Sequence, residues 1–521
     1  MCKATWLLLS SFLLFLCGVS GQRKASVLSA LVRGPYLQVA TDSSIWIRWR
    51  TDVSCRSRVR YGAEAGKLTG FADDSVLTTE HLVKLHQLTP HTRYYYSIGS
   101  FNDTLQTGAE NYFYTLPKPG TEDFYRIGVF GDCGNNSVNQ RNVKNAFISY
   151  LGDKYMDAWI LLGDNAYYNG TDAEFQAKFF NIYKDDLLKK YPLYPTPGNH
   201  DYHDVDFPAA TESAQKTHAI DYYKNFSMPV NGEAGGVPSG TQAFYSFDIG
   251  NVHFLSLDSY GKEANEYRLY DTMGPQVQWV KKDLEANTNK QWVVAYWHHP
   301  PYTMGSHNSD EETELVKIRE NFIGILERYG VDLVLCGHSH VYERSRLMKD
   351  NFGMETTFDS AKHNVSSSTA LFDGSKNSCP YIKDSARNTG TVYVVSGSAG
   401  QLGGMEKSFP HDAMFYSNAK DGGAAILEVQ GNRLDLKWIC ADGVQRDHFT
   451  MMKQVNKRLR YRIKKGESIT LTASYTGTYH WNKSSDTGKS ITVTPKSGTT
   501  VYTVNDNNGC LKDSFEVTVI K

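Results

Sequence analysis

Five short polar motifs in the middle of this 521-residue chain constrain its fold more than any other feature. Each motif comes directly after a run of apolar residues that is typical of a buried strand. The motifs are Gly131-Asp132-Cys133-Gly134, Gly163-Asp164-Asn165-Ala166-Tyr167, Gly198-Asn199-His200-Asp201, His298-His299-Pro300-Pro301-Tyr302 and Gly337-His338-Ser339-His340. A single Gly-Asp turn is common, but five such motifs in one region predict a shared functional site.

The segments around these motifs alternate between strand and helix patterns. Apolar runs such as Ala158–Leu162 and Trp292–Tyr296 indicate strands, whereas residues 142–151, 173–188 and 313–329 have helical patterns. This alternation predicts a central α/β domain over residues 122–452. Ligands of such folds bind outside the carboxyl ends of the strands, so the five motifs are expected to meet there.

The flanking segments have the alternating pattern of β structure instead. Residues 30–118 contain the alternation Ile45-Trp46-Ile47-Arg48-Trp49, and the segment Leu88-Thr89-Pro90-His91-Thr92-Arg93-Tyr94 resembles a corner of fibronectin type III domains. In that corner a Tyr hydroxyl bonds back to the backbone. Residues 455–521 alternate in the same way and resemble small immunoglobulin-like modules of bacterial secreted proteins. The expected fold is therefore multidomain: a fibronectin III-like β-sandwich, a central α/β domain and a small C-terminal β-sandwich.

The first 21 residues have the features of a signal peptide. Lys3 precedes an apolar run over residues 6–17, and the small residues Gly18, Ser20 and Gly21 follow. The run is shorter than the ~20 residues that span a bilayer, and no later segment is apolar enough. We therefore expect a secreted, cell-surface or periplasmic protein with no membrane span after cleavage.

The net charge bears on the binding partners, and the cysteines bear on zinc binding and disulfides. The formal net charge of -1 at pH 7 gives no reason to expect nucleic acid or an anionic membrane as a partner. The six cysteines that remain after cleavage match no zinc-binding spacing, and their pairing stays open. Cys133 and Cys336 lie inside motifs, so we expect them to be free thiols packed on strands.

The residue types in the motifs suit a pair of metal ions. Carboxylate, amide oxygen, imidazole and phenolate are hard or borderline ligands that favour Fe, Zn or Mn. A glycine precedes Asp132, Asp164, Asn199 and His338, which lets the backbone pass close to a metal. Two adjacent metals can clamp the attacking and leaving oxygens of a phosphoryl group.

Together the motifs resemble the purple acid phosphatases, a branch of the calcineurin-like metallophosphoesterases. The resemblance covers residues 30–452 and is most specific at Tyr167, in the run Gly337-His338-Ser339-His340-Val341-Tyr342-Glu343-Arg344-Ser345 and near Gly390–Gly400. It implies a central metallophosphoesterase β-sandwich flanked by helices. It also implies hydrolysis of phosphate monoesters by a metal-bound hydroxide.

The resemblance assigns the metal ligands residue by residue. Asp132, Tyr167 and His340 would hold Fe(3+), and Asn199, His298 and His338 would hold a divalent Fe, Zn or Mn ion. Asp164 would bridge both ions. In this family, the phenolate on ferric iron gives the purple colour.

Two further histidines are candidates for catalysis. His200 would contact the phosphate, and His307 would protonate the leaving oxygen. His299 is expected to be structural, and Asp201 is a candidate partner for a ligand.

Two alternatives remain open from the sequence. The same site could act on phosphodiesters, nucleotides or phytate in place of a small monoester. A protein of another class, a surface binding or adhesion protein with an inert core, would use the flanking β modules. The C-terminal module could attach the protein to a cell surface, or it could be an appendage that only stabilises the chain.

Overall fold

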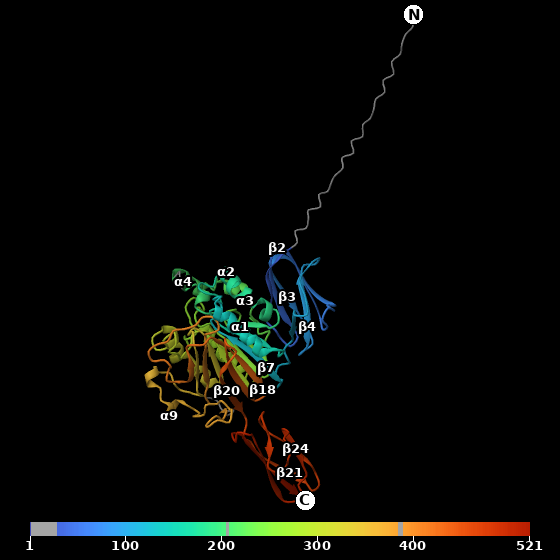
Figure 1. Cartoon of the computed structure of the whole chain (residues 1–521), viewed down its shortest axis with the longest axis vertical. Helices are drawn as coiled ribbons and strands as arrows, with labels where there is room; N and C mark the ends of the chain where they lie inside the picture. The colour runs from blue at the N-terminus through green and yellow to red at the C-terminus, as the bar shows by residue number, and fades with distance from the viewer. Residues whose placement is uncertain (2–28, 205–207, 384–388) are drawn as a thin grey trace.

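The structure is a computed structural model that describes Met1 and residues 29–204, 208–383 and 389–521. Apart from Met1, the predicted signal peptide lies outside the described residues. Figure 1 shows a β-rich N-terminal part in blue, a large central body in cyan to orange, and a small red β part that ends the chain.

The N-terminal part is built on one six-stranded sheet. Its strands are β1 (Leu31–Gln38), β2 (Ile45–Gly62), β3 (Gly70–Leu85), β4 (Arg93–Gly99), β5 (Thr104–Gln106) and β6 (Tyr112–Tyr114). Along β2, the side chains of Ile45, Ile47 and Trp49 are buried, as the period-two pattern predicts. The Tyr94 hydroxyl accepts a hydrogen bond from the Thr89 backbone N–H at 3.0 Å, so the expected kind of corner is present. The fibronectin type III assignment itself stays a prediction.

The central body contains two seven-stranded sheets. In spatial order the first sheet comprises β15 (Tyr381–Lys383), β20 (Gln445–Lys453), β19 (Arg433–Cys440), β18 (Gly423–Gln430), β7 (Phe124–Phe130), β8 (Ala158–Leu162) and β9 (Leu193–Thr196). The second comprises β10 (Tyr245–Ile249), β11 (Val252–Ser256), β12 (Trp292–Tyr296), β13 (Leu333–Cys336), β16 (Val392–Ser396), β14 (Tyr342–Ser345) and β17 (Met414–Asn418). One buried apolar cluster includes Ile160 of the first sheet and Val294 and Leu335 of the second, so the two sheets share a core.

Parallel pairing at the centre of each sheet positions the functional motifs. Strands β7, β8 and β9 run parallel to one another in the first sheet. Strands β11, β12, β13 and β16 do so in the second sheet. The carboxyl ends of these strands therefore lie at one edge of the two-sheet core, where loops carry polar residues.

The central body also contains helices and short helical turns, some of which pack on the two sheets. They are α1 (Val138–Leu151), α2 (Asp172–Glu174), η1 (Phe175–Phe180), α3 (Asn181–Tyr183), η2 (Lys184–Leu188), η3 (His200–Tyr202), α4 (Pro208–Thr217), α5 (Asp221–Asn225), α6 (Pro275–Ala286), α7 (Thr313–Lys317), η4 (Ile318–Phe322), α8 (Ile323–Tyr329), η5 (Glu355–Thr357) and α9 (Ser360–His363). Val143 and Phe147 of α1 join the core of the first sheet. Val280 of α6 and Leu326 of α8 pack with Val334 of the second sheet. The three helical patterns of the sequence fall within α1, α2–η2 and α7–α8.

The C-terminal part has two small sheets. One contains β21 (Arg458–Lys464), β26 (Lys512–Ile520), β25 (Thr499–Asn505) and β23 (His480–Trp481), and the other contains β22 (Ile469–Thr472) and β24 (Ser490–Val493). Its buried cluster includes Trp481, Phe515 and Met452, the last from the end of β20. A disulfide between Cys379 and Cys510 also ties this part to the central body. The immunoglobulin-like assignment stays a prediction.

The structure also tests what the sequence predicts for two cysteines and for membrane spans. Cys133 and Cys336 are free and buried, as predicted, but only Cys336 lies on a strand, because β7 ends three residues before Cys133. Across the described residues, every helix is too short or too polar to cross a membrane.

Candidate metal centre

The structure brings the five motifs together at the carboxyl ends of the central strands. Asp132 lies two residues after β7, Asp164 two after β8, and Asn199 three after β9. From the second sheet, His298 and His338 lie two residues after β12 and β13. Both sheets therefore contribute side chains to the same edge.

The backbone at three of these residues is strained. Asp132, Asp164 and His338 have positive φ angles of 56°, 51° and 67°. Residues with a Cβ rarely adopt this region, and each costs on the order of 1 kcal/mol or more unless its surroundings hold it. Strain at three neighbouring polar residues is typical of a functional site.

Two glycines allow the close approach of neighbouring carboxylates. A Cβ added at Gly198 would lie 2.1 Å from Asp164 Oδ1. A Cβ added at Gly337 would lie 2.6 Å from Asp132 Oδ2. Any larger residue would push these carboxylates away, which accounts for the glycine at both positions.

One group of donors forms around Asp132. The Tyr167 hydroxyl donates to Asp132 Oδ1 at 2.9 Å. His340 Nε2 lies 3.3 Å from the Tyr167 hydroxyl and 3.7 Å from Asp132 Oδ1. A carboxylate, a phenol and an imidazole thus converge on one point.

A second group forms around Asn199. Its Oδ1 lies 3.0 Å from His298 Nε2 and 3.1 Å from His338 Nδ1. Asp164 connects the two groups, because its Oδ1 lies 3.3 Å from His298 Nε2. Potential ligand atoms of Asp132, Asp164 and His298 all lie within 4.8 Å of one another.

The donor chemistry of the second group fits a cation. His338 Nε2 lies 3.1 Å from Glu312 Oε2, so in the neutral ring this nitrogen carries the hydrogen and Nδ1 is a lone pair. The Asn199 amide nitrogen donates to Asp204 at 2.6 Å, which leaves its Oδ1 facing that lone pair. Two acceptors that face each other are satisfied when a metal ion lies between them. Oxygen and imidazole donors suit Fe, Zn or Mn.

Protonation of His338, His340 and the phenol also fits metal ligation. At His298, burial lowers the pKa but the charge of Asp164 outweighs it and raises the pKa to about 9, so a metal ion would displace a proton from this ring. Burial and neighbouring His307 lower the pKa of His338 to about 3, and the same causes lower the pKa of His340 to about 3. Both rings are therefore neutral at pH 7, the form that binds metal. Burial, with the charges of Asp132 and Asp164, raises the pKa of Tyr167 well above its ordinary value. Ionisation of this phenol therefore needs a strong positive charge beside it.

His200 lies at the rim of the cluster and its neighbours fix it. Its ring centroid lies 4.5 Å from that of Tyr167. His200 Nδ1 lies 2.8 Å from the Tyr168 carbonyl oxygen, and Nε2 lies 3.7 Å from Asp164 Oδ2. Asp201 accepts from the backbone N–H of Gly198, so this carboxylate holds the loop that carries Asn199.

His307 lies against His338 and is held by a carboxylate that the motifs of the sequence do not indicate. His307 Nδ1 lies 2.8 Å from Glu312 Oε1, and His338 Nε2 lies 3.1 Å from Glu312 Oε2. The rings of His307 and His338 stack with centroids 3.7 Å apart. All nine residues predicted for the site therefore come together. The pattern His307-x4-Glu312 was the only available signal for Glu312, and it is a weak one.

The remaining histidine of the motifs, His299, has a structural environment. His299 is buried, and its Nδ1 lies 2.8 Å from the Ser259 hydroxyl. Its ring stacks on Tyr260 with centroids 5.4 Å apart. These contacts explain the buried position of His299 without a role in metal binding.

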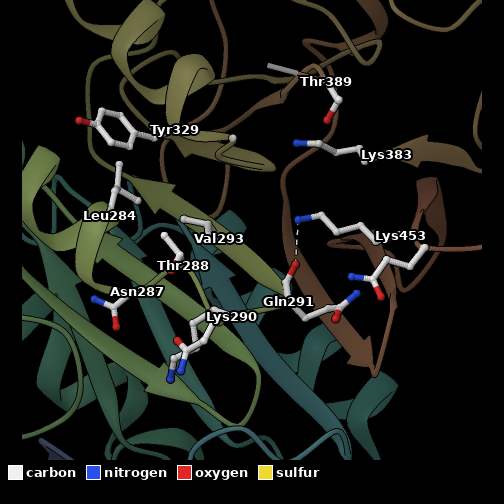
Figure 2. Close-up of a pocket in the computed structure, with 13 residues that line it drawn as sticks. Leu284, Asn287, Thr288, Lys290, Gln291, Val293, Tyr329, Lys383, Thr389 and Lys453 are labelled. Carbon is white, nitrogen blue, oxygen red and sulfur yellow. Dashed lines mark hydrogen bonds between the residues drawn. The ribbon is translucent and has the colours of Figure 1, made fainter. Parts of the chain in front are cut away.

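A polar cavity of about 350 Å³ lies at the other end of β12, away from this cluster. Figure 2 shows Lys383 and Lys453 pointing into it, opposite Val293 and Tyr329. Both ammonium groups bind Asp332 at 2.7 Å. The two lysines are thus held by a buried carboxylate that links β15 and β20 to the second sheet.

Comparisons with known proteins agree with this arrangement. Residues 125–342 match the calcineurin-like phosphoesterase family, and residues 32–115 match the purple acid phosphatase N-terminal domain. Purple acid phosphatase 23 of Arabidopsis thaliana is 28% identical over 377 residues, which cover 62% of this chain and 76% of that protein. Acid phosphatase type 7 of Mus musculus is 25% identical over 375 residues, which cover 65% of this chain and 76% of that protein.

A solved structure has the same fold. A purple acid phosphatase from yellow lupin (Lupinus luteus) seeds matches with a TM-score of 0.62 and 20% identity, over 82% of this chain and 75% of that one. Fold and family matches together define a calcineurin-like phosphoesterase. Because the domain that precedes the catalytic one also matches, the chain belongs to the purple acid phosphatase family. It is an acid phosphatase-type hydrolase, and the family implies a dinuclear metal centre.

Proposed function

We propose that the protein hydrolyses small phosphate monoesters at a dinuclear Fe(III)–M(II) centre. The observation that carries this proposal is the division of seven donors into two groups joined by Asp164. A lone metal would leave one group without an ion. An inert core would have no need for a neutral imidazole, His338, whose Nδ1 faces an amide oxygen.

Each group would hold one ion. Asp132, Tyr167 and His340 would hold Fe(3+), since a phenol with a raised pKa ionises best beside a trivalent charge. Asn199, His298 and His338 would hold a divalent Fe, Zn or Mn ion, and Asp164 would contact both. When bound, the metal pair supplies Lewis-acid activation of water and neutralises phosphoryl oxygens.

His200 would bind and orient the phosphate. The Tyr168 carbonyl fixes its Nδ1–H, so the ring can turn Nε2 only towards the side where Asp164 lies. A donor held in this way binds a phosphoryl oxygen without reorganising as charge develops there.

His307 would deliver a proton to the leaving oxygen. Glu312 accepts from Nδ1, which leaves Nε2 as the nitrogen that carries the transferable proton. Because the same carboxylate also holds His338, we assign Glu312 as a positioning residue for both rings.

The remaining parts of the chain would deliver and attach the enzyme. We propose a signal peptide at 1–21, a fibronectin III-like domain at 30–118, a catalytic domain at 122–452 and an immunoglobulin-like module at 455–521. Secretion follows from the first of these, and attachment to a cell surface from the last.

A visible spectrum combined with a substrate panel tests the proposal. Purified protein is expected to absorb visible light because of Tyr167 on ferric iron, and to hydrolyse aryl and alkyl phosphate monoesters. A colourless active protein with two zinc or manganese ions would contradict the iron assignment. Faster turnover of a diester, a nucleotide or phytate than of small monoesters would replace the proposed substrate class.

A further inference from the structure

The C-terminal part carries a charge that the rest of the chain lacks. Residues 455–521 contain eleven Lys and Arg against five Asp and Glu, which gives a formal charge of +6. Since the whole chain has a net charge of -1, residues 1–454 carry -7. Such an asymmetry between domains indicates a partner for the charged one.

Four of these cations form a row on strand β21. The row, called the β21 basic row below, comprises Arg458, Arg460, Arg462 and Lys464, and all four are exposed. Alternate residues of a strand share a face, and the rise of about 3.3 Å per residue makes the row about 20 Å long. Strand β21 is the edge of its sheet and lies at the C-terminal end of the molecule in Figure 1.

Little negative charge neutralises the row. Glu516 of β26 lies opposite Arg460 at a distance of 3.7 Å, and the Arg460 side chain is 85% exposed. Among the ion pairs between described residues, this is the one that involves the row. An exposed pair of this kind contributes little, so the row keeps most of its positive potential.

We propose that the β21 basic row binds an anionic polysaccharide. A straight line of cations matches the regular charges of a linear polymer, and Arg binds carboxylate, sulfate and phosphate groups through two parallel hydrogen bonds. Residues beside the row on β26 are Ser514, Glu516, Thr518 and Ile520, so of these four only Ile520, at the Lys464 end, is apolar, which is too little to insert into a membrane. The proposal rests on the attachment role of the C-terminal module and is independent of the metal centre.

A charged edge strand also has a simpler explanation, because charge prevents edge-to-edge aggregation. That explanation predicts aggregation of a neutral variant and no affinity for polysaccharide. A binding experiment therefore separates the two.

The test uses the full-length protein with heparin and polygalacturonate as probes and neutral dextran as the blank. The row variant carries Arg458→Gln, Arg460→Gln, Arg462→Gln and Lys464→Gln. The matched control carries Lys483→Gln, Lys489→Gln, Lys496→Gln and Lys512→Gln, four exposed lysines of the same part. A second variant, Arg460→Glu with Arg462→Glu, keeps the edge charged and soluble.

The proposal predicts salt-sensitive binding to both polyanions and none to dextran. Both row variants should raise the dissociation constant ~10-fold or more relative to the control variant. Hydrolysis of a small phosphate ester should stay unchanged in all variants, so loss of activity would report on the metal centre alone.

Three results would overturn the proposal. One is no binding to either polysaccharide. Another is an equal loss in the row and control variants, which would mean that net charge alone matters. The third is preferred binding to phosphatidylglycerol vesicles or duplex DNA, which would assign the face to a membrane or a nucleic acid.

Discussion

Asn199 links the two histidines that lie closest to it. Its amide oxygen faces His298 and His338 at 3.0 and 3.1 Å, while its amide nitrogen donates to Asp204. The orientation of the amide is therefore fixed from both ends. The proposed divalent-metal site therefore depends on the orientation of one amide group.

Substitution of Asn199 by Ala should abolish turnover of an aryl phosphate. Loss of the amide oxygen removes one donor of the second group, and we expect activity to fall by ~100-fold or more because the divalent ion is lost or misplaced. His338→Ala should behave in the same way. Steady-state kinetics with metal analysis on the same samples checks this, and retained activity with full metal content would count against the site.

Glu312→Gln should weaken metal binding without unfolding the protein. Removal of a carboxylate that orients a ligand typically costs 10–100-fold in metal affinity or activity, and we expect a loss of about that size here. Competition with a chelator measures the affinity directly. Glu311→Gln is the matched control, because Glu311 is an exposed neighbour. Equal chelator resistance of the two variants would remove the positioning role from Glu312.

His307→Ala should affect substrates according to their leaving groups. Loss of a general acid costs about 100-fold or more for alkyl phosphates, whose alkoxide leaves poorly, and much less for aryl phosphates. The comparison of kcat for one alkyl and one aryl phosphate is the readout. A uniform loss for both substrates would indicate a binding role instead.

The strands and helices determine where these residues lie, and only some of these positions can be predicted from the sequence. Strands such as β8 and β12 are contiguous apolar runs, so their ends, and hence Asp164 and His298, are readable from the pattern. Glu312 lies in a loop before α7, where no periodicity marks it. Its role depends on how α7 docks, which is a tertiary property. The division of the strands into two sheets, and their order in each sheet, is also a tertiary property that the sequence pattern does not give.

Between β10, β11 and α6, a buried histidine makes stability depend on pH. His253 bonds Asp248 at 2.7 Å and Asp283 at 2.6 Å. Burial alone would lower its pKa, but the two carboxylates outweigh burial and raise the pKa to about 9. The folded state thus holds a proton that the unfolded chain loses above its ordinary value of 6.5.

The stabilisation from His253 should be complete below pH 6.5 and should disappear as the pH rises towards 9. We expect a loss of up to about 3 kcal/mol over this interval. Thermal unfolding of the wild type and of His253→Asn between pH 6 and 9.5 measures it. If the two proteins lose stability in parallel, the histidine is not the cause.

A disulfide and an apolar contact connect the C-terminal part to the central body. The Cys379–Cys510 disulfide joins residues 131 positions apart, and Met452 of the central body enters the C-terminal core. No sequence spacing could have paired these cysteines, because the pairing depends on how the last module docks. The free thiol of Cys336 was predictable, since its strand β13 is buried, whereas Cys133 lies in the loop after β7.

Cys510→Ser should loosen the C-terminal part while activity persists. A bridge that closes a long loop contributes roughly 3–5 kcal/mol, so we expect earlier unfolding and faster proteolysis of residues 455–521. Limited proteolysis followed by mass analysis locates the cuts. A Cys379→Ser variant should give the same result, and equal resistance of variant and wild type would contradict it.

Elemental analysis of the purified protein measures the proposed dinuclear centre directly. We expect two metal ions per chain, one of them iron, and loss of the second ion in Asn199→Ala. A fully active enzyme with one ion per chain, or with none, would contradict it.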